Sequence, residues 1–432
     1  MGVNRKRGNT MKDSTKTTRV AYIIEAGFEH FISLFVTGTL LGYILDILGF
    51  SDAQQGVIST VATFTCGAQL FALVLTGRRR KRLVTVGHLI NQGCFVLLYL
   101  LPIFDLAPAV KSACLLLLLF SGHIINNAIN PTKITWLMGS VPNESRGRFT
   151  AIKEMISLAG GIAVSLGFGA VADTFRSADG MPTRPYYIIC TAALALMMLI
   201  HTVTLLISTE HPDASTVRTP IGQTVTRMIR NRELVKVIGV GMIWNIASAL
   251  STSFYASYLR QELAFSFTLI ALLSTAGSVC RIALSPLLGK IADKHSFSTS
   301  MTLAFAFAAA AFFAMSFTSP QTKWLYLVYV CLHAFAMAGI NSGVINLIYD
   351  YVAPADRAVA MGFKNALGGI LAFFTALASS FVLGAIQKAG GVVLFGYTLY
   401  AQQVLAFASC VAVLLLILYM RRVIAPLHRV DK

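Results

Sequence analysis

Charged residues are scarce in this chain. Only 12% of its 432 residues are Asp, Glu, Lys or Arg, and the 18 acidic residues are about half as many as the 35 basic ones. Hydrophobic residues make up 56%, and the mean hydropathy is +0.70. This composition is far from that of an average soluble domain. It predicts an all-α protein that crosses a membrane many times, since helices satisfy their own backbone in lipid.

Sequence signatures of common enzyme chemistry are also missing. The chain has no G-x-x-x-x-G-K-[ST] loop, no H-E-x-x-H motif and no G-x-S-x-G motif. Its seven cysteines are scattered through apolar segments and never form C-x-x-C, which favours a packing role over a disulfide or metal role. We therefore expect no enzymatic activity, no cofactor and no metal.

Twelve apolar segments are long enough to cross a bilayer at about 20 residues each. They are centred on residues 22–48, 55–76, 83–103, 110–138, 153–173, 186–208, 234–258, 267–288, 297–318, 324–350, 361–386 and 393–420. Residues 1–19 are basic and polar, and no cleavage signal follows them, so the first span is expected to remain in the mature protein.

The distribution of positive charge predicts the orientation of these spans. With the N-terminus inside, the cytoplasmic segments hold 27 Lys and Arg residues and the outer loops hold six. Because cytoplasmic loops carry the excess of basic residues, we expect both termini to lie in the cytoplasm. The protein is expected in the inner or plasma membrane of the cell. The formal charge of +17 is explained by this topology, so no nucleic-acid partner is expected.

An internal repeat divides the spans into two sets of six. GRRRKR begins at Gly77 and GKIADK at Gly289, an offset of 212, and Asn130 matches Asn341 at an offset of 211. Two pseudo-symmetric six-helix bundles are therefore predicted, an arrangement typical of transporters. The expected divisions are a tail at 1–19, a bundle at 20–208, a linker at 209–233, a bundle at 234–421 and a tail at 422–432.

The loop motif at 289–294 resembles one found in the major facilitator superfamily. GKIADK fits Gly-x-x-x-Asp-[Arg/Lys], and Arg146-Gly147-Arg148 is similar to the loop between spans 4 and 5 of that family. The resemblance implies that Gly289, Asp293 and Lys294 form a gating loop that biases the conformational equilibrium. The loop at Gly77 departs from the pattern because it has no matching Asp, and span 5 lacks the Gly-Pro element of many proton antiporters.

The segment 121–139 carries the densest polar stripe. At about 100° per residue, five polar residues fall within an arc of roughly 120°: His123, Asn126, Asn127, Asn130 and Lys133. One polar residue in a span usually makes an interhelical hydrogen bond, but five on one face favour a solute pathway.

The resemblance also implies that spans 1, 4, 7 and 10 line a central cavity, and these spans do carry polar faces. The candidate solute-binding residues are Glu29, His30, His123, Asn127, Asn130, Lys133, Trp244, Asn245, Thr252, His333 and Asn341.

Two carboxylates and two cations in the spans could carry charge-dependent chemistry. Glu29 is the candidate proton carrier, with Glu25 as the second acidic residue, although an interfacial or ion-paired position is favoured over a transport role for Glu25. Lys133 and Arg281 are the candidate buried cations. An ion pair of Lys133 with Glu25 or Glu29 is favoured over a docking point for an anionic solute.

The sequence thus predicts a secondary transporter for a small polar or anionic organic solute, working by alternating access and coupled to protons. Its partners would be the solute, the lipid bilayer and protons, and a monomer would suffice. Efflux of amphipathic drugs is the alternative. A membrane receptor that binds a solute without moving it is the third hypothesis.

Overall fold

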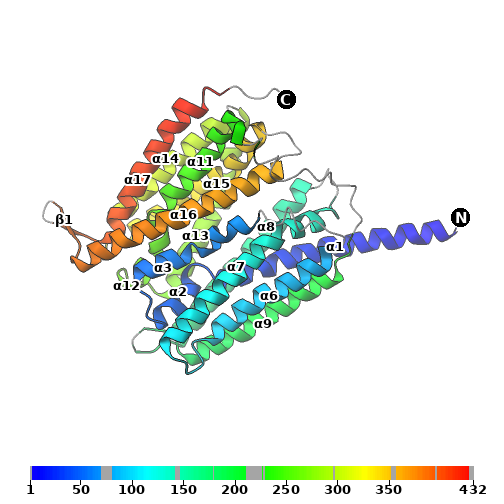
Figure 1. Ribbon diagram of the computed structural model, residues 1–432, viewed down its shortest axis with the longest axis horizontal. Coiled ribbons are helices and arrows are strands. Elements are labelled where there is room, and N and C mark those ends of the chain that lie inside the picture. Colours follow the sequence, from blue (N-terminus) through cyan, green and yellow to red (C-terminus); the bar gives the residue numbers. More distant parts are fainter. Residues whose placement is uncertain are drawn as a thin grey trace. The chain divides into compact units, whose positions relative to one another are not determined.

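The computed structural model describes residues 2–69, 80–141, 146–178, 180–210, 226, 229–294, 297–351, 357–394 and 397–427, and these are almost entirely helical (Figure 1). Within this part of the chain, ten helices are long and apolar enough to cross a membrane, and Leu325–Asn341 is a shorter apolar helix. The predicted all-α membrane architecture is therefore confirmed. The predicted second span coincides with short helices between residues 52 and 68, and its end lies outside the described residues.

The chain forms two compact units, of which the first comprises Met1–Gly49 and Ala68–Arg218. Its helices are α1 (Gly2–Phe35), α2 (Gly38–Ile47), α6 (Arg80–Leu100), α7 (Pro108–Met138), α8 (Arg146–Thr174) and α9 (Arg184–Ile207). Helix α6 packs between α7 and α9, and α1 packs on α8 and α9 (Figure 1).

The second unit comprises Phe50–Gly67 and Thr219–Lys432. It contains α3 (Asp52–Ser59), α4 (Val61–Phe64), η1 (Thr65–Ala68, ending at the division), α11 (Arg232–Ala249), η3 (Thr252–Phe254), α12 (Tyr255–Gln261), α13 (Phe267–Lys294), α14 (Phe297–Ser316), α15 (Leu325–Tyr351), α16 (Arg357–Lys388), β1 (Val392–Leu394), β2 (Tyr397–Leu399), α17 (Ala401–Tyr419) and a π-helical turn η5 (Met420–Ile424). Residues 50–67 belong to this unit because α3 and α4 pack against α16.

Several element boundaries differ from the sequence-based expectation. The expected tail at 1–19 is not separate from the first span, because helix α1 already begins at Gly2. The first span is broken after Phe35, where Gly38 has φ +57°, a conformation that glycine adopts without steric cost. The last span begins at Ala401, because residues 392–394 and 397–399 pair as the antiparallel strands β1 and β2. Most of the expected linker at 209–233 lies outside the described residues.

Each unit has its own apolar core. In the first unit, a cluster from α1, α6, α7 and α9 comprises Tyr22, Val84, Trp136, Leu137 and Leu205. In the second, a larger cluster is centred on Trp244 and the aromatic residues of α14 and α15. These cores fix the helices on which the polar side chains described below are carried.

Candidate functional site

A buried charged network joins α1 and α7 in the first unit. The ammonium of Lys133 donates a hydrogen bond to Glu25 Oε1 at 2.8 Å and a second one to Glu29 Oε2. Lys133 and Glu25 are each 1% exposed, whereas the side chain of Glu29 is 27% exposed. The structure therefore contains an internal ion pair between these residues, and Glu29 is its accessible end.

Two histidines from other helices extend this network. His201 of α9 places Nε2 3.0 Å from Glu25 Oε1, and the ring of His88 of α6 lies 4.9 Å from the ring of His201. Their exposed fractions are 1% for His88 and 0% for His201. Neither histidine was among the sequence-based candidates. With them, the polar cluster draws on the four helices α1, α6, α7 and α9 and not on α1 and α7 alone.

The charged network lies one helical turn from an apolar cluster. Tyr22 precedes Glu25 by three residues, Val84 precedes His88 by four, and Leu205 follows His201 by four. Residues at these spacings share one helix face, so each helix presents a polar residue and an apolar residue on the same face. The apolar cluster therefore lies next to the charged network on these helices.

The polar stripe of α7 makes further contacts within the first unit. Asn127 donates to the carbonyl of His123 at 3.1 Å and accepts a hydrogen bond from Gln69 at 3.1 Å. The ring of His123 packs 5.2 Å from Phe95. Asn130 is half-buried. This part of the stripe thus joins neighbouring residues by hydrogen bonds.

His30 of α1 lies against α8. A Cβ atom added at Gly161 would be 2.7 Å from His30 Nε2, so the imidazole occupies the space that this glycine leaves. Glu29, which precedes His30 in the chain and interacts with it electrostatically, belongs to the network of Lys133. Close helix packing explains its position, and its role in solute binding stays a prediction.

In the second unit, Trp244 and His333 share one aromatic cluster. Their ring centroids are 6.5 Å apart, and His333 stacks on Tyr329 at 5.2 Å. His333 Nε2 has no hydrogen-bond partner among the described residues. Sequence reasoning therefore selected two residues from different helices that do lie together.

The remaining candidates of the second unit are dispersed. Asn245 fills the space beside Gly368, where an added Cβ would lie 2.1 Å from its Nδ2. Thr252, at the break between α11 and α12, donates to the carbonyl of Ser248 at 2.9 Å. Asn341 is exposed.

The expectation of a buried cation at Arg281 requires correction. This side chain is exposed on α13, because a guanidinium on a long apolar stem can extend away from the helix core. The expected gating loop is part of the same helix, which continues to the exposed Lys294. Gly289 and Asp293 lie within this helix, and the side chain of Asp293 is outside the part that the structure describes.

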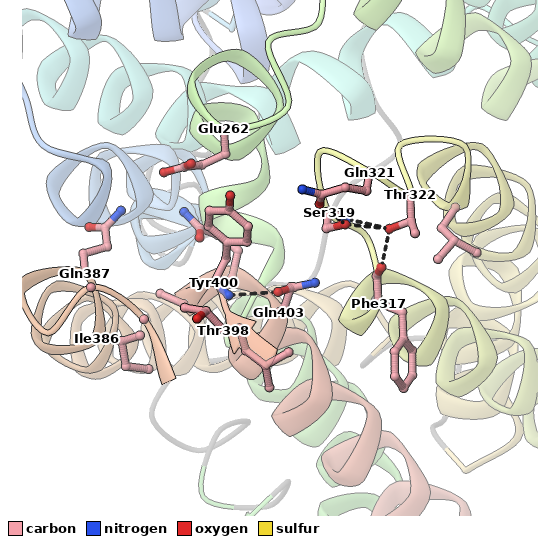
Figure 2. Close-up of a pocket in the computed structure, with 16 residues that line it drawn as sticks. Glu262, Phe317, Ser319, Gln321, Thr322, Ile386, Gln387, Thr398, Tyr400 and Gln403 are labelled. Atoms are coloured by element: carbon pink, nitrogen blue, oxygen red, sulfur yellow. Dashed lines mark hydrogen bonds between the residues drawn. The ribbon is translucent and has the colours of Figure 1, made fainter. Parts of the chain in front are cut away.

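A cavity of about 1240 Å³ opens within the second unit. Figure 2 shows Glu262, Gln387 and Tyr400 around it, with the loop of Ser319 and Thr322 on another side. Half of the lining residues carry an amide or a hydroxyl, although most of the lining surface is apolar, and Glu262 is its one carboxyl among the described residues. Burial, together with nearby Asp52, raises the pKa of the Glu262 carboxyl. None of these lining residues was a sequence-based candidate.

A signal for the missed histidine was present in the sequence. Thr85, His88, Asn91 and Gln92 recur on one face of α6 and are all buried. Asn91 donates to the carbonyl of Gly122 at 2.8 Å. The family resemblance directed attention to spans 1, 4, 7 and 10, whereas α6 corresponds to the third span.

Comparison with known proteins gives a family match over most of the chain. The model of the MFS_1 like family matches residues 31–371. No curated protein matches the chain.

Solved structures share the fold at low sequence identity. A mutant form of the nucleoside transporter NupG superposes with a TM-score of 0.71 at 13% identity, covering 94% of this chain and 99% of that one. A D-xylose-proton symporter superposes with a TM-score of 0.70 at 12% sequence identity, covering 94% of this chain and 97% of that one. A POT family peptide transporter superposes with a TM-score of 0.68 at 13% sequence identity, covering 97% of this chain and 98% of that one.

Proposed function

Because the chain belongs to the MFS_1 like family of membrane transporters, we propose that it moves a small polar or anionic organic solute by alternating access, coupled to protons. The chain is a multi-pass transporter and not an enzyme. We further propose that it lies in the inner or plasma membrane with both termini in the cytoplasm, and that it functions as a monomer.

The observation that carries this proposal is the pairing of Lys133 with both Glu25 and Glu29. Its ammonium binds two carboxylates, and Glu29 is the one that solvent can reach. A proton that adds to Glu29 would remove one of these partners, while Glu25 would keep the ammonium charged and in place. Lys133 could then bind a solute carboxylate or phosphate as a point charge.

This scheme conserves charge. One proton enters with one negative solute charge, so the buried network has the same net charge before and after loading. Since a change of net charge inside the membrane is costly, an exchange without it is favourable. Glu29 is thus assigned as the proton carrier and Lys133 as the solute contact, while Glu25 holds Lys133.

The other predicted site residues are assigned to the solute path. His123, Asn127 and Asn130 would contribute from α7, and His30 from α1. Trp244, Asn245, Thr252, His333 and Asn341 would contribute from the second unit. Amides and hydroxyls at these positions favour a solute with several hydrogen-bonding groups.

The test begins with the purified protein and a thermal-shift screen of organic acids, amino acids, sugars and amphipathic drugs. Uptake of a hit is then measured in proteoliposomes with and without a pH gradient. We expect an organic anion to stabilise the protein and the gradient to drive its uptake. If amphipathic drugs stabilise the protein instead, efflux becomes the better assignment.

Glu29→Gln tests the proton carrier. This variant should lose the acceleration by the pH gradient, because a neutral amide cannot release a proton. Glu154→Gln is the matched control, since it makes the same change at an exposed residue of α8. Gradient-driven uptake that survives Glu29→Gln would contradict the assignment.

A further inference from the structure

The side chains of Glu25, His88 and His201 meet inside the first unit. One possible ligand atom from each lies within 4.8 Å of the others. The three residues come from α1, α6 and α9 and are at most 1% exposed. Two imidazoles and a carboxylate at this separation form a donor set typical of transition-metal sites.

Several polar atoms of this cluster have unused hydrogen-bonding capacity. Among the described residues, neither ring nitrogen of His88 has a hydrogen-bond partner, and the same is true of His201 Nδ1 and Glu25 Oε2. Buried polar atoms are nearly always paired in folded proteins. Four unpaired atoms at one place therefore indicate that something else binds there.

The charge of the cluster favours a cation. With both histidines neutral, the two carboxylates of Glu25 and Glu29 outweigh the one ammonium of Lys133, which leaves the network with a net charge of −1. Lys133 and His201 both contact Oε1 of Glu25, so Oε2 is available for another ligand. A bound cation would compensate the negative charge and pair these atoms.

The spacing fits a tetrahedral metal ion. Metal–ligand bonds of about 2.0–2.1 Å place two ligand atoms of one tetrahedral ion about 3.3 Å apart. His201 Nε2 lies 3.0 Å from Glu25 Oε1, which is close to this value, and an ion bound by Nε2 and the carboxylate would replace the hydrogen bond between these two atoms. The longer distances in the cluster require small side-chain rotations to reach it.

We propose that Glu25, His88 and His201 bind one late first-row divalent cation of the Zn²⁺ class, with water as the fourth ligand. Imidazole ligands favour such ions over Mg²⁺ and Ca²⁺, which prefer oxygen. The ion would join α1, α6 and α9, because its ligands come from these three helices. The site goes beyond the proposed transport function but shares Glu25 with it, because Glu25 also contacts the ammonium of Lys133.

The experiment uses the purified full-length protein after treatment with a chelator. Co²⁺ is titrated in, and its visible absorption reports the coordination geometry, after which Zn²⁺ is added as a competitor. We expect one Co²⁺ per chain with the strong bands of a tetrahedral site, displacement by Zn²⁺ and a higher melting temperature with either ion.

Variants locate the site. His88→Ala and His201→Ala should each weaken binding by more than about 100-fold, since removal of even an indirect metal contact costs 10- to 100-fold. His123→Ala is the matched control, because this buried histidine of the first unit lies on α7 and is not part of the cluster. Its Co²⁺ affinity should equal that of the unsubstituted protein.

The unsubstituted protein decides the outcome even if a variant fails to fold. Absence of stoichiometric Co²⁺ and Zn²⁺ binding overturns the proposal and leaves the cluster to water or a proton. Binding that both histidine variants retain, with melting curves showing folded protein, overturns it as well. Neither result depends on whether solute transport has been detected.

Discussion

Lys133 is the residue on which the charged network depends, since it neutralises two carboxylates away from water. Lys133→Met should lower the free energy of unfolding by about 3–5 kcal/mol, because it leaves Glu25 buried without its cation. Thermal melts of the detergent-purified protein measure this effect. Lys388→Ala, at an exposed lysine of α16, should leave the melting temperature nearly unchanged.

A compensating variant separates the charge effect from simple packing loss. Glu25→Gln combined with Lys133→Met should recover part of the lost stability, since neither buried charge then remains unpaired. If the loss of unfolding free energy in the double variant equals the sum of the losses in the two single variants, Lys133 does not stabilise the protein through the ion pair.

Glu262 gives a prediction for the dependence of stability on pH. Its carboxyl lies outside the spanning segments, and burial, with Asp52 nearby, raises its pKa. A raised pKa means that the folded state favours the protonated carboxyl, so this group becomes destabilising as the pH rises through its folded pKa. Glu262→Gln should therefore raise the melting temperature at pH 8. At about pH 3.5, below the ordinary range of a glutamate, the two proteins should melt alike, and a constant difference would contradict this reasoning.

Sequence reasoning was most successful for residues that are conspicuous in an apolar run. Glu25, Glu29 and Lys133 carry charge within spans, and the structure pairs them. His88 and His201 were missed because a neutral histidine in a helix is ambiguous and because their meeting depends on how α6 and α9 pack against each other and α9 against α1. The prediction of a buried cation at Arg281 was wrong, since charge in a span does not determine the direction in which a long side chain extends.

At the scale of elements, the contact between α4 and α16 depends on Gly369. A Cβ at this position would be 1.8 Å from the carbonyl oxygen of Thr63, so a side chain would force the two backbones apart. Gly369→Ala should cost about 1–3 kcal/mol as overpacking does in other cores. Gly384→Ala, on the same helix and with no atom within 4 Å of the added Cβ, should be neutral or slightly stabilising. Equal melting temperatures for the two variants would contradict the close contact.

The elements themselves were largely predictable from hydropathy, but their ends were not. Val393 and Leu394 continue the apolar character of the last span, so hydropathy alone includes them in it. Their pairing with residues 397–399 in a hairpin makes them strands instead. Breaks such as the one at Gly38 depend on backbone conformation, which an apolar window does not report.

At the scale of the whole molecule, the imbalance of 27 against six basic residues predicts the topology. A fluorescent protein fused to the C-terminus should fold and fluoresce, since that end is expected in the cytoplasm. An alkaline phosphatase fusion at the same place should be inactive, while one inserted at Lys323 in an expected outer loop should be active. The reverse pattern would overturn the predicted orientation.

Solute counterflow tests the central claim of transport most directly. Proteoliposomes are loaded with an unlabelled solute that stabilises the purified protein, then diluted into a trace of the same solute carrying a label, with no pH gradient. A transporter that alternates its access exchanges the two, so the label should accumulate transiently inside, and Glu29→Gln should retain this exchange while losing gradient-driven uptake. If the protein binds the solute and no label accumulates, the protein is a receptor, which contradicts transport by alternating access.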